Sequence, residues 1–527
     1  MTKTVAIVGA GECGLGAVKT CLEEGLLPTA YDKLDTLGGM WNYDSDTSIT
    51  SPFRLYRSLV SNSCTIMTCY SDFPFPKDAP PFVQHKTYLK YLHDYANHFK
   101  VRDYIQLQTE VIKIEQAEDY QRTGRWDVHV KREGEELVKK TFDFVMICSG
   151  YVSEPHIPNY PAQEDFIGEV LHSCQYRTSD HFIDKTVLVI GGSFSATDVA
   201  HEVGNVAKQV YLSVRRGLWV YPRRAMGGWP YDVLLDNRFT TRWIPGKIFK
   251  FLYQRFLERD VDYDVTGLRP ERPLFDEFFS VSDNIFTAIN CGKVKVKPGI
   301  KRFLPKGVEF TDGTSLEDID IVVWGTGYDV KTPFIDDKLV SDDIYTRDLY
   351  KYVFPARLPH ATLACIGLIP PDSGLTPIGE IQSRWAMRIF KGHIALPPMQ
   401  KMLEDISQKD KELVERYGRR RLFVPGVALT DELAEEIGCY PSLKRLFMTD
   451  PRLAIKVFFG PIAPFTYRLF GPHTWPGARD AMMNCWELCK TGIEGRSGIQ
   501  HSKSNSSWNL LSLLIVLFAV LFFMFII

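Results

Sequence analysis

The first 21 residues constrain the fold of this chain more than any other stretch. An apolar, β-rich run at residues 4–8 leads into Gly9-Ala10-Gly11-Glu12-Cys13-Gly14, and a helical pattern follows through Cys21. A strand, a G-x-G-x-x-G turn and a helix in this order are typical of a dinucleotide-binding βαβ unit. The three glycines permit the tight turn, the approach of a pyrophosphate and the close packing of helix on strand. The sequence therefore predicts an α/β fold with a nucleotide site at residues 9–14.

The residue after the next predicted strand indicates which dinucleotide binds. Residues 28–31 end in Asp32, which lies 23 residues past Gly9. A carboxylate at this point accepts hydrogen bonds from ribose hydroxyls and repels a 2′-phosphate, so FAD or NAD is favoured. The glycine pair of Leu37-Gly38-Gly39-Met40-Trp41 is of the kind that flavoproteins place beside their cofactor, and it favours FAD. A glycine-rich turn without a ligand is the alternative.

A second unit of the same kind begins 182 residues after Gly9. The buried-strand pattern at 187–190 precedes Gly191-Gly192-Ser193-Phe194-Ser195-Ala196, in which Ser193 stands where the second glycine is expected. The next strand pattern, 210–214, runs into Arg215 and Arg216, whose guanidiniums suit a 2′-phosphate because arginine grips phosphate oxygens in a fork. We predict an NADPH site here, with a solvated arginine pair as the alternative. Ser193 either donates to the pyrophosphate or loosens NADPH by adding a Cβ.

Charge and cysteine content exclude several classes of protein. The 62 Lys+Arg against 64 Asp+Glu leave a net charge of -2, which gives no electrostatic basis for binding nucleic acid. The 11 cysteines are irregularly spaced and include no CxxC pair, so they match neither a secreted disulfide framework nor the redox relay of a disulfide reductase. We expect reduced thiols facing the cytosol and no metal site.

The C-terminal run at 510–527 predicts a membrane anchor. Its 18 residues carry no charge, and only Ser512 is polar. At about 1.5 Å per residue a helix of this length spans ~27 Å, close to the hydrocarbon thickness of a bilayer. Trp508 lies at the predicted interface, and Arg496 and Lys503 precede it, so the positive-inside rule places the large N-terminal body in the cytosol. We expect a tail anchor at 508–527 in contact with membrane lipid.

Several further motifs resemble one family of flavoproteins. Residues 166–176, FIGEVLHSCQY, match FxGxxxHxxxY, the signature of the flavin-containing monooxygenases. Residues 61–64 and 70–74 are similar to the family segment that carries its active-site asparagine, residues 324–328 resemble its ATGY motif, and residues 382–385 its QGRW motif. With the predicted anchor, the resemblance is to the animal microsomal members. It implies a tail anchor in the endoplasmic reticulum membrane, with the catalytic body facing the cytosol.

The resemblance also implies an NADPH- and O2-dependent enzyme of the N,N-dimethylaniline monooxygenase type. In this family NADPH reduces FAD, O2 adds at flavin C4a, and the resulting hydroperoxide oxygenates a soft nitrogen or sulfur atom of a small xenobiotic or metabolic amine or thioether. Asn62 is the implied catalytic residue, with a turn-capping asparagine as the alternative. The implied FAD contacts are Gly9, Ala10, Gly11, Glu12, Cys13, Gly14, Asp32, Met40, Trp41 and Ser63; the implied NADPH contacts are Ser61, Asn62, Gly191, Ser193, Ser195, Ala196, Thr197, Asp198, Arg215 and Arg216.

The repeated nucleotide unit predicts two Rossmann-like domains, with the NADPH-binding domain inserted into the FAD-binding domain. We expect the FAD domain at 1–155 and 321–445, resuming at the buried strand pattern 321–324, and the NADPH domain at 156–320. Residues 446–507 are interpreted as a membrane-apposed extension, or a packing layer, that ends in a Ser- and Gly-rich linker. The sequence leaves homo-oligomer formation open.

Two other functions stay open at this point. One is an NADPH oxidase that releases H2O2 or a ketone oxygenase that forms esters, although Tyr176 ends the linker motif where ketone oxygenases usually carry tryptophan. The other is a membrane paralogue that binds FAD, has weakened turnover and acts through partners. The altered turn at 191–196 favours this last interpretation.

Overall fold

Two five-stranded parallel sheets organise the part of the chain that the computed structural model describes, which is residues 2–51, 54–277, 279–336, 338–341, 348–418 and 424–493. The first sheet has the strand order β22-β7-β1-β2-β3. Its central strand is buried after its first residue, as expected for a parallel strand covered on both faces. The bounds are β1 Thr4–Val8, β2 Leu27–Tyr31, β3 Ile105–Gln106, β7 Phe144–Ile147 and β22 Leu363–Cys365.

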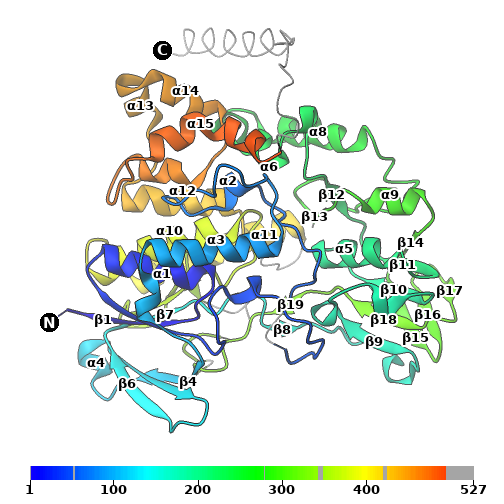
Figure 1. Cartoon of the computed structure of the whole chain (residues 1–527), viewed down its shortest axis with the longest axis horizontal. Helices are drawn as coiled ribbons and strands as arrows, with labels where there is room; N and C mark the ends of the chain where they lie inside the picture. The colour runs from blue at the N-terminus through cyan, green and yellow to red at the C-terminus, as the bar shows by residue number, and fades with distance from the viewer. Residues whose placement is uncertain are drawn as a thin grey trace.

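Helices cover one face of the first sheet and a small antiparallel sheet covers the other (Figure 1). The helices are α1 (Glu12–Glu23), α3 (His85–His98) and α10 (Leu375–Phe390), and α1 packs along α10. The antiparallel strands are β4 (Thr109–Gln116), β5 (Trp126–Arg132) and β6 (Val138–Phe142). Trp126 of β5 is fully buried in the core between the two sheets.

The second sheet repeats this arrangement with the order β14-β11-β10-β18-β9. Its strands are β9 Glu169–His172, β10 Thr186–Ile190, β11 Gln209–Ser213, β14 Val294–Lys297 and β18 Ile321–Trp324. Helices α5 (Phe194–Val203) and α9 (Ile285–Asn290) pack on one side, and β15 (Ile300–Leu304), β16 (Gly307–Phe310) and β17 (Ser315–Leu316) on the other. The predicted nucleotide repeat is therefore present as two similar units.

The strand at 321–324 corrects the predicted domain boundary. We expected this strand to resume the first unit, but β18 pairs with β10 and β9 of the second sheet. The strand that returns to the first sheet is β22, which pairs with β7. The apolar pattern of 321–324 fits a central strand of either sheet, and only the pairing decides between them. The first unit therefore resumes between β18 and β22.

The remaining elements are short strands and helices around the two units. The strands are β8 Glu154–Pro155, β12 Trp219–Tyr221, β13 Phe279–Val281, β19 Tyr328–Asp329, β20 Leu349–Tyr350 and β21 Phe354–Pro355. The helices are α2 Thr65–Thr68, α4 Tyr120–Thr123, α6 Tyr231–Leu235, α7 Arg238–Arg242, α8 Gly246–Glu258, α11 Met399–Tyr417, α12 Gly426–Ile437, α13 Leu443–Thr449, α14 Pro451–Phe459 and α15 Ala478–Thr491.

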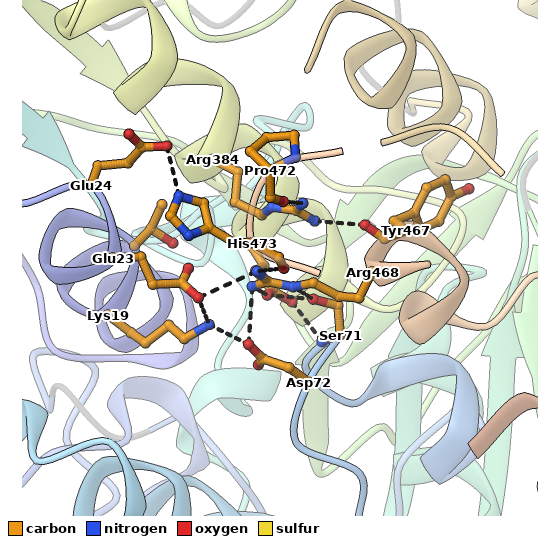
Figure 2. A network of polar contacts seen from close by, with 12 residues as sticks. Lys19, Glu23, Glu24, Ser71, Asp72, Arg384, Tyr467, Arg468, Pro472 and His473 are labelled. Carbon is orange, nitrogen blue, oxygen red and sulfur yellow. Dashed lines mark hydrogen bonds and ion pairs between the residues drawn. The ribbon is translucent and has the colours of Figure 1, made fainter. Parts of the chain in front are cut away.

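A network of buried charges attaches the C-terminal helices to the first unit (Figure 2). Arg468 ends the 3-10 helix Pro464–Arg468, and its fully buried guanidinium contacts Glu380 at 2.7 Å, Asp72 at 3.2 Å and Glu23 at 3.3 Å. Burial lowers the pKa of Arg468, but these carboxylates, led by Glu380, more than offset it and the net direction is upward. Removing one partner from such a buried network costs about 3–5 kcal/mol, because an unpaired charge remains.

The motif at 382–385 belongs to the same attachment. Arg384 donates to the carbonyl oxygens of Tyr467 at 3.2 Å and Pro472 at 3.3 Å (Figure 2), and Trp385 Nε1 donates to Glu436 at 2.6 Å. Residues 464–468 are buried. This part of the extension is therefore a packing layer on the first unit, which is one of the two interpretations that the sequence left open.

No helix within the described ranges is long and apolar enough to cross a bilayer. The anchor predicted at 508–527 lies outside the described residues.

Candidate functional site

One cavity joins the carboxyl ends of the two parallel sheets, where ligands bind in sheets of this kind. Its volume is about 1510 Å³, which exceeds the ~300–1,000 Å³ of a pocket for one small ligand. Among the predicted site residues, its wall includes Glu12, Met40, Trp41, Ser61, Asn62, Ser63, Gly191, Ser193, Ser195, Arg215 and Arg216. Side chains from both nucleotide units therefore face one space.

The first turn is a tight cradle that only glycine can form. Gly9 has φ +106°, and a Cβ there would lie 2.6 Å from the Cys148 carbonyl oxygen. A Cβ on Gly14 would lie 2.0 Å from the Gly9 carbonyl oxygen. Helix α1 begins without a side-chain cap, which leaves its first N–H groups for an anion. The geometry fits the phosphate end of a dinucleotide.

Asp32 is fixed beside this turn by the backbone. Its carboxylate accepts hydrogen bonds from Ala10 N at 2.7 Å and Leu34 N at 2.9 Å. Burial raises the pKa of Asp32, and these two donated hydrogen bonds oppose the rise. The carboxylate is held in place at the end of β2, where the sequence predicted the acceptor for ribose hydroxyls.

Glu12 and Trp41 meet in a buried polar cluster on the cavity wall. Burial raises the pKa of Glu12, whose Oε2 accepts hydrogen bonds from Thr376 and, at 3.2 Å, from the hydroxyl of Tyr88. The Tyr88 ring stacks on Trp41 with centroids 3.7 Å apart. This cluster makes a rigid, aromatic wall next to the first turn.

Asn62 lies between the two units and is oriented by Arg223. The guanidinium of Arg223 donates to Asn62 Oδ1 at 2.8 Å and to the Ser61 carbonyl at 3.1 Å, and it pairs with Asp283 at 3.2 Å. A guanidinium has donors only, so the oxygen of the Asn62 amide must face it. The amide nitrogen of Asn62 is then left to donate into the cavity.

The second turn uses different residues for a similar backbone. Gly191 has φ +136°, and a Cβ there would lie 2.2 Å from the Gly325 carbonyl oxygen. Ser193 caps α5 with extended backbone (φ -120°, ψ -178°), and its side chain makes no capping hydrogen bond. Arg215 and Arg216 line the cavity, and neither forms an ion pair with a described residue. The two guanidiniums are placed to receive an anionic group of a ligand.

The sequence comparisons agree with this geometry. Residues 2–526 match the family described as FMO-like: Flavin-binding monooxygenase-like. The chain belongs to this family. It is 38% identical over 532 residues to "Flavin-containing monooxygenase 1" of Sus scrofa, which covers 99% of this chain and 100% of that protein. It is 39% identical over 494 residues to "Dimethylaniline monooxygenase [N-oxide-forming] 4" of Mus musculus, covering 92% of this chain and 88% of that protein.

Solved structures share the fold of this family member. The S-allyl-L-cysteine S-oxygenase from Allium sativum superposes with a TM-score of 0.64 and 24% identity, covering 92% of this chain and 99% of that one. The cyclohexanone monooxygenase from Rhodococcus sp. Phi1 bound to NADP+ superposes with a TM-score of 0.57 and 16% identity, covering 83% and 98%. Because both identities are low, these structures show the fold alone.

Some predicted contact residues do not line this cavity. Ala196 and Thr197 are fully buried, and the hydroxyl of Thr197 bonds with that of Ser280 at 2.7 Å. Asp198 accepts a hydrogen bond from the Tyr56 hydroxyl. These three side chains hold α5 in place and are not part of the cavity wall, and their contact with NADPH stays a prediction. The residues of the first turn other than Glu12, and Asp32 beside that turn, are also absent from the wall of this cavity; they are Gly9, Ala10, Gly11, Cys13, Gly14 and Asp32.

His172 of the linker motif has a structural role. Its Nε2 donates to the Gly327 carbonyl at 3.0 Å, and its Nδ1 accepts from Cys174 N at 3.1 Å. Burial lowers the pKa of His172 to about 4, so the ring stays neutral at physiological pH. The motif therefore ties the start of the second unit to the turn after β18.

Sequence reasoning missed several residues of the site. Arg223 orients Asn62 from 161 positions away, and Tyr88 and Thr376 bind Glu12 from other elements. The sequence pattern predicts helices around Tyr88 and Thr376 but no contact with Glu12. No motif singles out Arg223. Several carboxylates that carried no motif also line the cavity, among them Asp232, Asp236 and Asp372.

Proposed function

We propose that this chain is an NADPH- and O2-dependent monooxygenase that oxygenates soft nitrogen or sulfur atoms of small amines and thioethers. The main support is a cavity whose wall carries Asn62 together with residues of both nucleotide turns. The mouse relative is named as forming N-oxides and the Allium sativum protein as an S-oxygenase, which supports both kinds of acceptor atom.

The residues of the two turns fit FAD and NADPH respectively. The cradle at Gly9 and Gly14 has no space for a Cβ, and Asp32 stands where ribose hydroxyls would bind. Arg215 and Arg216 would hold the 2′-phosphate of NADPH, because their guanidiniums face the cavity without an ion pair to a described residue. A bound flavin supplies the redox chemistry, accepting hydride from NADPH and activating O2.

Asn62 contributes a fixed hydrogen-bond donor to this chemistry. Arg223 donates to its amide oxygen at 2.8 Å, which leaves the amide N–H groups of this cavity-lining residue to donate to a ligand. A preorganised donor stabilises negative charge on oxygen more than a mobile one, because it needs no reorganisation during the reaction. The stacked Trp41 and Tyr88 rings exclude water from the neighbouring wall, which suppresses side reactions with water.

The direct test measures where the electrons of NADPH go. Full-length protein purified in detergent with FAD receives NADPH and O2, with and without a tertiary amine or a thioether, and H2O2 and oxygenated product are quantified. The proposal expects product in proportion to the NADPH consumed. H2O2 without product supports the oxidase alternative instead, and no NADPH consumption supports the inactive paralogue.

Arg223 offers a sharper version of this test. Arg223→Gln removes the fixed donor to Asn62 Oδ1, so the share of NADPH that yields product is expected to fall by about tenfold, with more H2O2 in its place. Arg224→Gln is the matched control, because the neighbouring Arg224 side chain is exposed and contacts neither Asn62 nor Ser61. Equal product yields in the two variants would remove the assigned role of Arg223.

For location, we propose that residues 508–527 anchor the protein in the endoplasmic reticulum membrane with the catalytic body in the cytosol. The uncharged run at 510–527 and the preceding Arg496 and Lys503 support this orientation. The full chain is expected to resist extraction of membranes with alkaline carbonate, and a chain ending at residue 507 is expected to be released. Glycosylation at Asn505 would reverse the orientation.

A further inference from the structure

One end of the cavity carries three carboxylates that the proposed function does not use. Asp232 lies on α6, Asp236 directly follows α6, and Asp372 lies in the turn before α10. Asp232 Oδ2 accepts a hydrogen bond from Cys64 N at 2.7 Å, only two residues from Asn62. The acidic end of the cavity therefore adjoins the loop that carries Asn62.

The three carboxylates differ in their hydrogen bonds. Asp232 also accepts from Val233 N at 3.0 Å, and Asp372 accepts from Gly426 N at 2.7 Å. The backbone of Asp236 is bonded on both sides, to Asp232 and Ile462. Its carboxylate receives no hydrogen bond from any residue in the described ranges, although it faces the cavity. The Asp236 carboxylate is thus a hydrogen-bond acceptor with no donor among the described residues.

A second, independent observation comes from two tyrosines that line the same cavity. Tyr221 is 6% exposed and lines the same cavity, and its buried hydroxyl has no hydrogen-bond partner within the described part of the chain. The hydroxyl of Tyr231 is unpartnered in the same way. Buried hydroxyls are satisfied in nearly all native proteins, so two of them on one wall indicate a polar ligand.

Electrostatics at this end favours a positive ligand. Burial raises the pKa of Asp236 to about 8, and the charges of Asp232 and Asp372 add to the rise. Burial raises the pKa of the Tyr221 hydroxyl, and Tyr263, Asp372 and Asp236 add to the rise.

The cationic side chains at this end of the cavity already contact acceptors. Burial raises the pKa of Asp372, and the hydrogen bond from Gly426 N and the charge of Arg416 only partly oppose the rise. Arg416 itself donates to the Phe275 carbonyl at 2.9 Å and lies 3.9 Å from Asp276. Lys250 pairs with Asp276 at 2.6 Å, and Arg242 donates to Tyr440 at 2.6 Å and lies 3.9 Å from Glu435. None of them bonds to Asp236.

The residues that line this end of the cavity disfavour a metal ion and favour an organic cation. No group of three acidic, histidine or cysteine side chains in the described ranges converges closely enough to hold a metal ion. Aromatic rings line the same space: the Tyr221 ring stacks on that of Phe279 with centroids 4.5 Å apart, and the Tyr231 ring is tilted against that of Tyr253 with centroids 5.1 Å apart. Aromatic faces attract organic cations, and oxygen acceptors bind N–H groups. An organic cation with N–H donors meets both conditions.

We propose that Asp236, with Asp232, Asp372 and the hydroxyl of Tyr221, forms a subsite for an N–H-bearing organic cation, an ammonium or guanidinium group, of the substrate. The inference rests on the proposed function for the chemistry at the Asn62 end. A protonated nitrogen has no lone pair to oxygenate, so the oxygenated atom is a second nitrogen or sulfur of the same molecule. The substrate class is therefore a small molecule with a cationic head at the carboxylates and a soft nucleophile near Asn62.

Binding of a probe tests the subsite without turnover. Hexylammonium chloride and 1-hexanol, which differ in the charged head, are titrated calorimetrically into the FAD-loaded full chain in detergent, without NADPH. Asp236→Asn is expected to weaken hexylammonium binding by about tenfold or more and to leave 1-hexanol unchanged, because a bond to a charged group is lost. Glu435→Gln is the matched control, since Glu435 lines the cavity but faces Arg242. Equal losses in both variants, or equal affinity of the two probes for the unaltered protein, overturn the subsite.

Proton release provides a readout that a merely structural role of Asp236 would not give. With a pKa near 8, Asp236 must lose a proton to pair with the cation at pH 7, so hexylammonium affinity is expected to rise from pH 6 to pH 8. Calorimetry in buffers of different ionisation enthalpy is expected to show proton release that Asp236→Asn abolishes. If Asp236→Asn fails to fold, Tyr221→Phe serves instead, and a loss of a few-fold in hexylammonium affinity is expected. Binding independent of pH overturns the assignment.

Turnover separates this inference from the proposed function. Steady-state kinetics compare two thioethers, (methylthio)ethylamine, which is protonated at pH 7, and ethyl methyl sulfide, which carries no charge. The subsite predicts a KM at least about tenfold lower for the cationic thioether. Oxygenation of both with equal KM overturns the subsite and keeps the proposed function, whereas oxygenation of neither overturns the proposed function while the calorimetric result still decides on the subsite.

Discussion

In the turns at residues 9–14 and 191–196, the helix packs closely on the neighbouring strand. The glycine that allows this lies on the helix in the first unit and at the strand end in the second. In the first unit the helix carries Gly14 and the neighbouring strand end carries Cys148. In the second, the helix carries Ala196 and the strand end carries Gly325, where a Cβ would lie 2.6 Å from the Cβ of Ala196. The space between helix and strand is thus shared by two positions. A sequence motif that covers only the helix position registers Ala196 as a departure. The paired strand position, Gly325, compensates for the larger side chain.

The second position of the motif is glycine in the first turn, Gly11, and serine in the second, Ser193. Gly11 and Ser193 both have extended backbone, with φ -76° and -120°, which any residue adopts. Gly11 faces Gly39, whose own Cβ would lie 2.9 Å from the Gly11 Cα. A Cβ on Gly11 itself would lie 3.5 Å from the Gly39 Cα, which is an ordinary contact, so the close approach requires glycine at position 39 rather than at position 11. The backbone of the second turn likewise accommodates Ser193 without strain.

The largest expected effect comes from filling the first turn. Gly14→Ala places a Cβ 2.0 Å from the Gly9 carbonyl oxygen, and a backbone atom in a tight turn cannot move away. A loss of about 3 kcal/mol or more in stability, with most of the bound flavin, is expected. Flavin absorbance per chain and thermal unfolding measure it. The control is Ala196→Gly at the matching place, which is expected to keep its flavin. A Gly14→Ala protein with full flavin content contradicts the cradle.

The next effect concerns the arginines that distinguish the second unit. Replacing Arg215 and Arg216 by Ala is expected to raise the KM for NADPH by about 10- to 100-fold, because charge-assisted bonds to the 2′-phosphate are lost. The KM for NADH, which lacks that phosphate, is expected to stay within about twofold. Steady-state kinetics with both cofactors measure the difference. Equal losses with NADPH and NADH would remove the phosphate assignment.

A smaller effect tests the balance of sizes between helix and strand. Gly325→Ala is expected to destabilise the protein by about 1–3 kcal/mol, because its Cβ meets Ala196 at 2.6 Å. Adding Ala196→Gly is expected to restore part of the loss, since the two sites share one space and their effects are not additive. Denaturant unfolding of the single and double variants measures the coupling. Additive effects would show that the two positions are independent.

The smallest effect is expected at Ser193. Its hydroxyl makes no capping hydrogen bond, and its backbone is unstrained, so the side chain is available to a bound pyrophosphate. Ser193→Gly is then expected to weaken NADPH binding by a few-fold, about 1 kcal/mol, and to leave flavin content unchanged. Equilibrium titration with NADPH measures the shift. Tighter NADPH binding would instead show that the serine Cβ loosens the cofactor.

The sequence predicted the two units well because their signals are local. The apolar runs at β1, β2, β10 and β11 and the glycines between them follow from rules of one strand and one turn. The strand β18 was placed in the wrong unit, because apolar strands of parallel sheets look alike and their pairing is a long-range choice. The resemblance implied that Ala196 and Thr197 contact NADPH; helix packing buries both side chains, which the sequence did not indicate.

What the sequence determined by itself is the presence of two dinucleotide turns, their difference in charge at Asp32 and at Arg215 and Arg216, and the segment that carries Asn62. These depend on contiguous residues whose conformational limits act over a few positions. Only the tertiary structure decided that Arg223 orients Asn62, that Arg468 attaches the C-terminal helices to the first unit, and that Asp236 and Tyr221 line one cavity. The partners in these contacts are far apart in the sequence, and hydrogen bonds and charges act through space.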